Sequence, residues 1–415
     1  MTAMMPPISA PRAIPWRQLA RQTALFLGIV ISGGLLLFPR LPMMSGVLLL
    51  SAAVAGPFKI FRYELLGIWL LLLVVAADVL LAAGGFQLGA LAIRYANFLT
   101  GLAMLAMYLD GTRNQLAIDY FPLGRFMAIQ AILTPLLALV VPGLFRVFVV
   151  RETEIHSLLL IFNFHDFSGD TVLLKRPDGF FFEPGVLQLY LNIYLFISLF
   201  VVRGRWWDPV IGTLGVIATQ STSGALVLVV IYAAALLRWM KTASPRGKII
   251  VLMLLPVVMA PVALYAAINL SDKFYGDGRG SSWARQYDLF TGLAVIREYP
   301  LTGIGFDYDR YFEVGGKVGY LESDLSDDNI SERPNSNGVL TLFYSIGIPL
   351  AFVFLFGLFR QKFLSNRWIL MSIMIISLSS EALFFTPFVL MIVYSGLLMT
   401  RRLQAVQSMT PYRAR

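Results

Sequence analysis

The chain has 415 residues, of which 58% are hydrophobic and only 14% are charged, and its mean hydropathy is +0.73. Soluble domains contain about a quarter charged residues, so this composition excludes a disordered chain and argues for membrane spans rather than one large soluble core. The net charge of +9 comes from 33 Lys and Arg against 24 Asp and Glu. Cysteine is absent, which excludes disulfides, thiolate nucleophiles and Cys-based zinc sites.

Apolar runs of about 15–22 residues recur along the whole chain, and a membrane-spanning helix needs about 20. We therefore predict an all-α polytopic membrane protein with about twelve transmembrane helices, forming one integral membrane domain over residues 1–415. The expected spans lie near residues 22–38, 42–57, 64–83, 92–109, 126–142, 184–202, 208–219, 224–238, 249–268, 338–359, 368–381 and 383–399.

The distribution of basic residues orients these spans. The start of the chain is basic, with Arg12, Arg17 and Arg21 before the first span, and no clear small-residue cleavage site follows. When both termini are placed in the cytoplasm, most of the 33 Lys and Arg residues fall on cytoplasmic segments, as the positive-inside rule requires. The basic charge therefore indicates topology, and we expect no nucleic-acid partner.

Two long polar segments, 143–183 and 269–337, are expected to face outward. Loops longer than about 12–15 residues are usually functional or disordered. These two segments hold most of the 24 acidic residues, yet they also contain Phe, Tyr, Trp and Gly. That mixture predicts folded caps over the membrane rather than flexible tails.

A helix is expected in the larger outer segment, over residues 282–299. Ser282 can cap its N-terminus, and a proline follows its last turn. Leu289, Leu293 and Ile296 recur at helical spacing and form one apolar face. Such a helix would lie along the membrane or pack on the bundle.

Four polar stretches that are distant in sequence are expected to meet at the outer face. They are Arg285 on the loop helix, Asn335 and Asn337 before the tenth span, Glu183 at the start of the sixth span, and Ser223 before the eighth. Each has a structural alternative: the asparagines and Glu183 can cap helices, and Ser223 can belong to a polar turn. The functional alternative is that arginines and helix N-termini together bind an anionic group.

The order of these motifs resembles the O-antigen ligase/polymerase superfamily. In its signature, an Arg precedes a helix that ends in Pro, then a Gly-x-Gly-Phe turn, then a polar element that opens the next span. The matching residues here are Arg285, Pro300-Leu-Thr-Gly303-Ile-Gly305-Phe306, Asn337, Leu340 and Gly347-Ile-Pro. Ligases of this group carry a His beside the loop Asn, where this chain has Ser336, which favours a polymerase.

Two further segments strengthen the resemblance. The stretch Arg176…Gly179-x-Phe-x-Glu183-Pro-Gly is similar to polymerases of lipid-linked exopolysaccharide repeat units. Ser221-Thr-Ser223-Gly224 is similar to the superfamily's Thr-x-Ser-Arg-Gly region, with the Arg missing. The resemblance covers roughly residues 175–360 and extends to the layout of spans around one large outer loop.

The resemblance implies a membrane glycosyltransferase bundle of the GT-C-like class in the bacterial inner membrane, with its active site facing the periplasm. It implies a polymerase that joins undecaprenyl-pyrophosphate-linked oligosaccharide repeat units into O-antigen or exopolysaccharide. The donor and acceptor are both lipid-linked, no cofactor, metal or nucleotide sugar is needed, and the partners are the lipid bilayer and a chain-length regulator protein. An O-antigen ligase acting on a lipid A–core acceptor is the first alternative.

In this interpretation an acceptor hydroxyl attacks the anomeric carbon of the donor and lipid pyrophosphate leaves. Glu183 is the candidate general base and Arg285 the candidate group that stabilises the pyrophosphate, because a guanidinium stays charged and binds phosphate bidentately. The residues expected to bind substrate are Arg176, Arg279, Arg297, Ser223, Tyr287, Asn335 and Asn337.

Other groups support alternatives. His165 and Asp166 could form a base pair of the Asp-oriented kind, although a solvated histidine is the simpler interpretation. Asp324, Asp327 and Asp328 could bind a divalent cation, although an acidic loop surface is simpler.

A transporter or flippase is the second alternative to the polymerase. Such proteins concentrate polar groups and broken helices at the membrane midplane, often in two repeated halves. The notable acids within the expected spans are Asp78 and Glu381, the latter near an outer turn. Because most polar residues lie in the outer segments, an enzyme of the outer face fits better.

Overall fold

The computed structural model describes residues 16–34, 39–56, 59–82, 88–111, 114–150, 153–165, 175–242, 244–246, 248–249, 279–318, 335–399 and 412–413, with single positions at 253, 260 and 264. The fold is mostly helical. The helices are α1 (Trp16–Ser32), α2 (Arg40–Ala55), α3 (Leu66–Ala82), α4 (Leu88–Ala106), α5 (Gln115–Val140), α6 (Pro184–Phe200), α7 (Asp208–Ala218), α8 (Thr222–Thr242), α10 (Arg279–Glu298), α11 (Tyr308–Lys317), α12 (Gly338–Phe359), α13 (Arg367–Leu378) and α14 (Pro387–Leu397). Short 3₁₀ helices are η1 (Lys59–Phe61), η2 (Tyr63–Leu65) and η3 (Pro142–Leu144).

Eleven expected spans correspond to helices in the structure, namely α1–α8 and α12–α14. The expected span near 249–268 falls almost entirely outside the described residues. Four described helical segments are long and apolar enough to cross a membrane: Tyr63–Ala82, Gln115–Val140, Thr222–Lys241 and Gly338–Phe359. Six shorter apolar helices pack with them. These are the features of a helical membrane protein, and the number and direction of its spans stay predictions.

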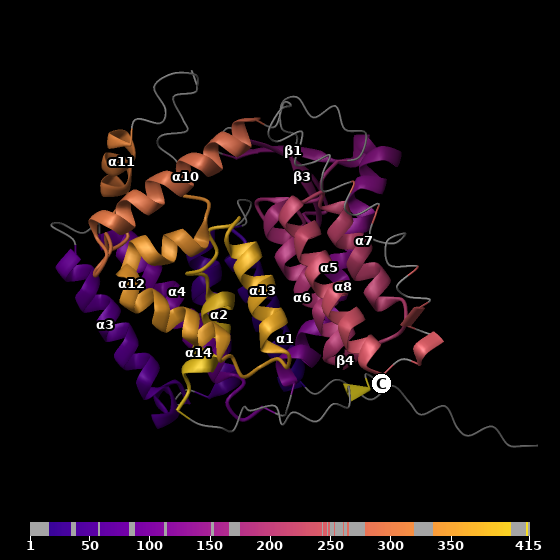
Figure 1. Ribbon diagram of the computed structural model, residues 1–415, viewed down its shortest axis with the longest axis horizontal. Coiled ribbons are helices and arrows are strands. Elements are labelled where there is room, and N and C mark those ends of the chain that lie inside the picture. Colours follow the sequence, from indigo (N-terminus) through magenta and orange to yellow (C-terminus); the bar gives the residue numbers. More distant parts are fainter. Residues whose placement is uncertain are drawn as a thin grey trace, which may run out of the picture.

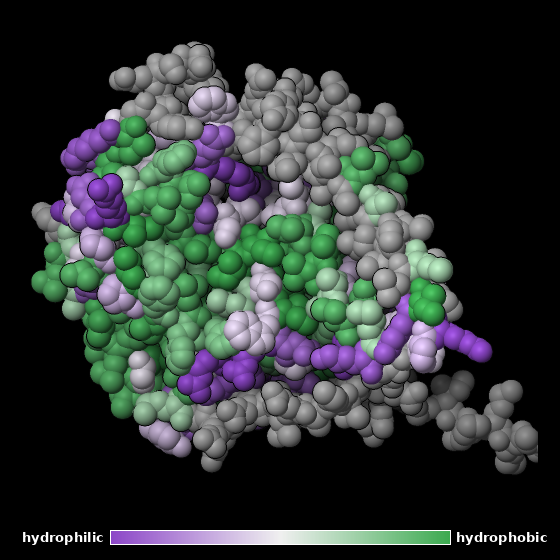
Figure 2. Space-filling model, viewed as in Figure 1, coloured by the Kyte–Doolittle hydropathy of each residue, from purple (hydrophilic) through white to green (hydrophobic). Residues whose placement is uncertain are grey.

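One face of the molecule shows how the side chains suit a bilayer. Apolar residues cover the middle of this face, and hydrophilic residues lie toward its two ends (Figure 2). Many large apolar side chains of α3 are exposed, including Leu70, Leu73 and Leu81. Outward-facing leucines of this kind are stable in contact with lipid.

α5 begins well before the expected residue 126, because its charged residues are paired. Arg21 Nε donates to Asp119 Oδ2 at 2.6 Å, and Arg125 Nε donates to Asp208 Oδ1 at 2.8 Å. Both carboxylates are fully buried. A buried charge is tolerated when it is paired and hydrogen-bonded, so these charges extend the helix instead of ending it.

The expectation of an all-α fold is wrong in one region. Three antiparallel strands form a sheet in the order β1 (Arg146–Val150), β2 (Thr153–Leu158) and β3 (Phe162–His165). Along β2 the inward positions alternate, with Ile155 and Ser157 buried, which is the strand period of two. A second, parallel pair joins β4 (Val202–Arg203) to β5 (Tyr412–Arg413).

The expected loop helix is confirmed as α10, which begins at Arg279. It lies across one end of the bundle, over α12, and the β1–β3 sheet lies at the same end (Figure 1). We call this the cap end. Of the two alternatives for this helix, packing on the bundle is the one observed, because α10 contacts α12. The contact is made by the buried residues Tyr287, Thr291 and Val295, with Ile296 partly buried beside them. Leu289 and Leu293 of the expected apolar face are instead 43% and 48% exposed.

α12 is broken at Gly347, and the turn 300–305 docks at the break. Gly347 has φ +70° and ψ 167°, which a residue with a Cβ rarely adopts. The carbonyls of Tyr344 and Ser345 accept from the backbone N–H groups of Ile304 and Gly305 at 2.8 and 2.9 Å. The Gly-bearing turn singled out in the sequence therefore supplies the hydrogen-bond donors for the carbonyls freed at the break in α12.

Candidate functional site

The segment 175–183 is held on the β1–β3 sheet and delivers Glu183 to the start of α6. Asn163 Nδ2 donates to the Gly179 carbonyl at 2.6 Å, and the backbone N–H of Asp178 donates to the Asn163 carbonyl at 2.9 Å. Pro184 then occupies the first turn of α6, a position that suits proline. Glu183 has the backbone conformation of an N-cap residue, but its side chain makes no capping hydrogen bond.

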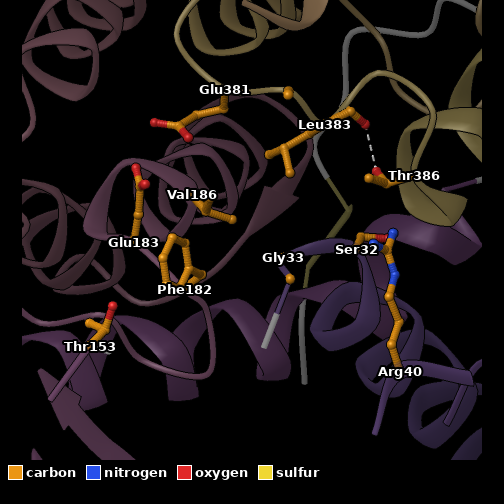
Figure 3. A pocket seen from close by; sticks show the side chains of 12 residues that line it. Ser32, Gly33, Arg40, Thr153, Phe182, Glu183, Val186, Glu381, Leu383 and Thr386 are labelled. Carbon is orange, nitrogen blue, oxygen red and sulfur yellow. Dashed lines mark hydrogen bonds between the residues drawn. The ribbon is translucent and has the colours of Figure 1, made fainter. Parts of the chain in front are cut away.

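Glu183 therefore occupies the N-cap position that the structural alternative expected, but its side chain does not bond a backbone N–H of α6. Its side chain lines a cavity of about 480 Å³ at the cap end. Glu381, from the turn between α13 and α14, lines the same cavity. Figure 3 shows the two carboxyl groups on one side of the cavity and the guanidinium of Arg40 on the other, near Ser32.

Gly185 explains how the two acids come together. A Cβ at this position would lie 2.0 Å from Glu381 Oε1, so only glycine leaves room for that carboxyl group against α6. Glu381 itself is buried, with 7% of its surface exposed. Because its carboxyl group lies beside the first turn of α6, the dipole of that helix also favours its negative charge.

Arg285 and Ser223 reach the same turn from two other elements. Arg285 Nη1 donates to the Ser380 carbonyl at 3.4 Å, and the arginine is otherwise at an exposed position. Ser380 Oγ donates to Ser223 Oγ at 3.1 Å. The predicted residues Glu183, Arg285 and Ser223 thus all lie around the 379–386 turn, although they come from distant segments.

A buried polar chain continues from Ser223 into the bundle. Gln188 Nε2 donates to Ser223 Oγ at 3.5 Å, and Asn192 Nδ2 donates to Gln188 Oε1 at 2.9 Å. Both α6 side chains are fully buried. Their spacing of four residues on one apolar helix is a signal that could have identified them.

Arg176 lies at the cap end but is already engaged. Its Nε donates to the Thr219 carbonyl at 3.2 Å, which ties the segment 175–183 to the end of α7. A guanidinium has five N–H groups, so this contact leaves others available for a ligand. Arg176 therefore stays a candidate for anion binding as well as a structural contact.

Other predicted binding residues have structural roles. Asn337 caps α12, because its Oδ1 accepts from the N–H groups of Val339 and Leu340 at 3.1 and 3.0 Å. Asn335 is buried, and its Nδ2 donates to the Asp288 carbonyl at 2.7 Å and to the Tyr311 hydroxyl at 3.0 Å. The capping interpretation of this stretch is the one that the geometry supports.

The remaining predicted residues lie on α10. Tyr287 is buried against α11, where a Cβ at Gly315 would lie 2.1 Å from its hydroxyl, so it does not line the cavity. Arg297 is exposed in the last turn, about 18 Å along the helix from Arg285 at 1.5 Å per residue. The backbone of Arg279 begins α10, and its side chain lies outside the described part of the structure.

His165 pairs with Asp178, a partner that sequence proximity did not indicate. His165 Nδ1 and Asp178 Oδ2 are 2.7 Å apart and both side chains are buried, whereas Asp166 lies outside the described residues. Burial raises the pKa of Asp178 to about 7, against the opposing effect of His165. Burial lowers the pKa of His165, but the bond to Asp178 outweighs it and raises that pKa. The pair therefore tends to hold one proton between its two members near neutral pH.

This buried pair lies directly behind the cavity wall. The His165 ring stacks on Phe182, with ring centroids 6.1 Å apart, and Phe182 lines the cavity next to Glu183. The sequence contains Asp178-Gly179, a pair typical of a turn. Asp178 meets His165 only because the β1–β3 sheet holds the segment 175–183 in place, and this could not be read from the sequence. The dyad is therefore a support for the site rather than a group within it.

The described residues contain no group of three or more His, Asp or Glu side chains suited to a metal ion. Asp324, Asp327 and Asp328, for which an acidic loop surface was the simpler interpretation and a cation site the alternative, lie outside the described residues. What the site can do is set by carboxyl groups beside hydroxyl and guanidinium groups, which suits proton transfer and anion binding. Comparison of the chain with protein-family models, curated proteins and solved structures found no match.

Proposed function

We propose that this protein is a membrane glycosyltransferase that polymerises oligosaccharide repeat units carried on undecaprenyl pyrophosphate at the periplasmic face of the bacterial inner membrane. The single observation that carries the proposal is the cavity at the cap end, with Glu183 and Glu381 in its wall and Arg285 bonded to the same turn. Glycosyl transfer from a lipid pyrophosphate is helped by a carboxylate that accepts the proton and a cation that stabilises the leaving pyrophosphate. The sequence resemblance supports the same chemistry.

In the proposed reaction, Glu183 accepts the proton of an acceptor hydroxyl as that oxygen attacks the anomeric carbon. The bond from the anomeric carbon to the pyrophosphate oxygen breaks, and the lipid pyrophosphate carries away the electron pair. Arg285 stabilises the negative charge that grows on this oxygen, with Arg176 or Arg279 assisting. Ser223 is positioned to orient a sugar hydroxyl, because its Oγ already lies in a chain of hydroxyl and amide groups.

The ligase alternative is disfavoured at Ser336. Ligases of the resembled superfamily have a His at this position, whereas Ser336 here donates through its Oγ to Asp288 Oδ2 at 2.5 Å and through its N–H to the same oxygen at 3.0 Å. A hydroxyl held in this way supports the start of α12 and does not replace an imidazole base.

The transporter alternative draws on the break in α12, since discontinuous helices build many transport sites. In those sites the freed backbone groups face the substrate. Here the carbonyls of Tyr344 and Ser345 are bonded to the turn 300–305, and Ile348 N–H donates to the Pro300 carbonyl at 2.8 Å. The break is therefore filled by the protein's own chain.

The proposal is tested with the purified protein and its lipid-linked repeat unit in detergent or in vesicles. A polymerase produces a ladder of products that differ by one repeat unit. A single transfer to a lipid A–core acceptor, without a ladder, would replace the polymerase by a ligase. Movement of the intact lipid-linked unit across the vesicle membrane without covalent change would support a transporter.

A further inference from the structure

Arg40 lies at the end of the cavity opposite the carboxyl groups, and a second arginine, Arg94, lies close to it. Arg40 is the first residue of α2 and lines the cavity, and Arg94 comes from α4, which packs on α2. The two side chains are close enough for their like charges to interact. Neither residue was singled out by the sequence, because each is one charge at the end of an apolar run.

The described neighbours of Arg94 hold it in place, but none of them is a carboxylate paired with its charge. Its Nη2 donates to the Tyr308 hydroxyl, and its guanidinium lies 5.4 Å from the centroid of the Phe306 ring. Within the described part of the chain, neither Arg40 nor Arg94 forms an ion pair with a carboxylate. Arg310, by contrast, forms an ion pair, because Asp307 Oδ2 lies 3.5 Å from its Nε.

Like charges without a counter-ion repel, and an anion placed between them removes that repulsion. The start of α2 adds to this effect, because the first turn of a helix carries partial positive charge and α2 has no acid there. Guanidinium groups match the geometry of phosphate oxygens and can bind them bidentately. The chemistry that fits this end of the cavity is a phosphate or diphosphate group.

We propose that Arg40 and Arg94 form a binding subsite for a diphosphate, and that this subsite holds the anionic part of a lipid-linked substrate while its sugar lies toward Glu183 and Glu381. The cavity then has an anion-binding end and a proton-transfer end, as the opposite positions of Arg40 and Glu183 show (Figure 3). A polymerase needs two lipid-linked substrates, so this subsite serves one of them and Arg285 serves the other. This last step rests on the proposed function, whereas diphosphate binding does not.

The test measures equilibrium binding of three probes to the purified full chain in detergent: farnesyl diphosphate, farnesol and inorganic pyrophosphate. Arg40→Gln is the main variant, because Arg40 lines the cavity and forms no ion pair or hydrogen bond with the described residues. We expect it to weaken farnesyl diphosphate binding by at least about tenfold, since one charge-assisted contact is lost, and to leave farnesol binding unchanged. Arg94→Gln should weaken the same probe.

Arg146→Gln is the matched control, because it removes one exposed positive charge from β1 at the same end of the molecule. It should bind farnesyl diphosphate like the wild type. Wild-type binding by Arg40→Gln, or an equal loss in Arg146→Gln, would overturn the subsite. Equal affinity for inorganic pyrophosphate and farnesyl diphosphate would assign the subsite to a free anion and overturn the lipid assignment.

Binding and turnover separate this inference from the proposed function. If Arg40→Gln weakens farnesyl diphosphate binding but the wild type never produces a ladder, the subsite is supported and the polymerase assignment is wrong. If the wild type produces a ladder and Arg40→Gln binds the probe as well as the wild type does, only the subsite is contradicted.

Discussion

At the scale of single residues, Glu183 combines the backbone of a helix cap with a side chain that does no capping. That side chain instead faces a cavity shared with Glu381. We expect Glu183→Gln to reduce the rate of ladder formation by about 10²–10⁴-fold, the usual range for loss of a general base. Glu154→Gln, at an exposed position of β2, is the control and should retain activity. Full activity in Glu183→Gln would mean that another group takes the proton.

Gly185 offers a way to move Glu381 without changing its chemistry. In Gly185→Ala the added methyl group would lie 2.0 Å from Glu381 Oε1, so the flexible carboxyl end must shift. We expect a clear loss of activity with little change in stability, since alanine suits a helix. Gly46→Ala, where the methyl group enters open space on α2, serves as the control. Equal activity in the two variants would show that the position of Glu381 does not matter.

The His165–Asp178 pair predicts how stability depends on pH. The unfolded chain releases the Asp178 proton near its ordinary pKa of 3.8, whereas the folded protein keeps it to about 7, and the pKa of His165 is also raised. The folded state therefore binds more protons across this range, and its stability falls as the pH rises from about 4 past 7. Thermal unfolding in detergent should show this fall, and Asp178→Asn should flatten it. The same slope in both proteins would contradict the assignment.

At the scale of elements, α12 depends on a glycine at its break. In Gly347→Ala the new Cβ would lie 2.0 Å from the Leu301 carbonyl oxygen, at a φ of +70°. Strain of this kind costs about 1–3 kcal/mol, before any displacement of the turn 300–305. We expect a lower unfolding temperature than that of Gly89→Ala, which adds a methyl group in open space on α4. Equal unfolding temperatures would mean that the break can close into a regular helix.

Hydropathy located most of the apolar helices because burial in lipid requires long apolar runs, and that requirement is local in sequence. The hydropathy pattern placed the start of α5 too late, at residue 126, because the charges of Asp119 and Arg125 interrupt the apolar run. Their ion-pair partners lie on α1 and α7, far away in sequence. The β1–β3 sheet was missed, although the alternation in β2 was visible, because strands outside the membrane do not need long apolar runs.

The residues of the candidate site also divide into those that a local sequence motif indicates and those that depend on contacts between distant segments. Glu183, Arg285 and Ser223 could be predicted because each lies beside a span boundary with a motif of its own. Asn335 and Asn337 looked alike in sequence but cap and support α12 in the structure. The role of Glu381 could not be foreseen, since it depends on the space left by Gly185 on a different helix.

At the scale of the whole molecule, the predicted topology can be tested directly because the chain contains no cysteine. Single cysteines can be placed at two exposed positions, Glu154→Cys in β2 and Arg205→Cys before α7. A thiol reagent that does not cross the inner membrane should label Glu154→Cys in intact spheroplasts and Arg205→Cys only after permeabilisation. The reverse pattern would invert the orientation and move the cap end to the cytoplasm.

The docking of the turn 300–305 on α12 also bears on how the protein is made. The carbonyls of Tyr344 and Ser345 need the N–H groups of Ile304 and Gly305, since unsatisfied carbonyls in apolar surroundings are costly. The ribosome synthesises the turn before it synthesises α12. In the proposed orientation the turn has then already been translocated when α12 enters the membrane, so the helix meets its partner on arrival, and the order of synthesis is also the order of assembly.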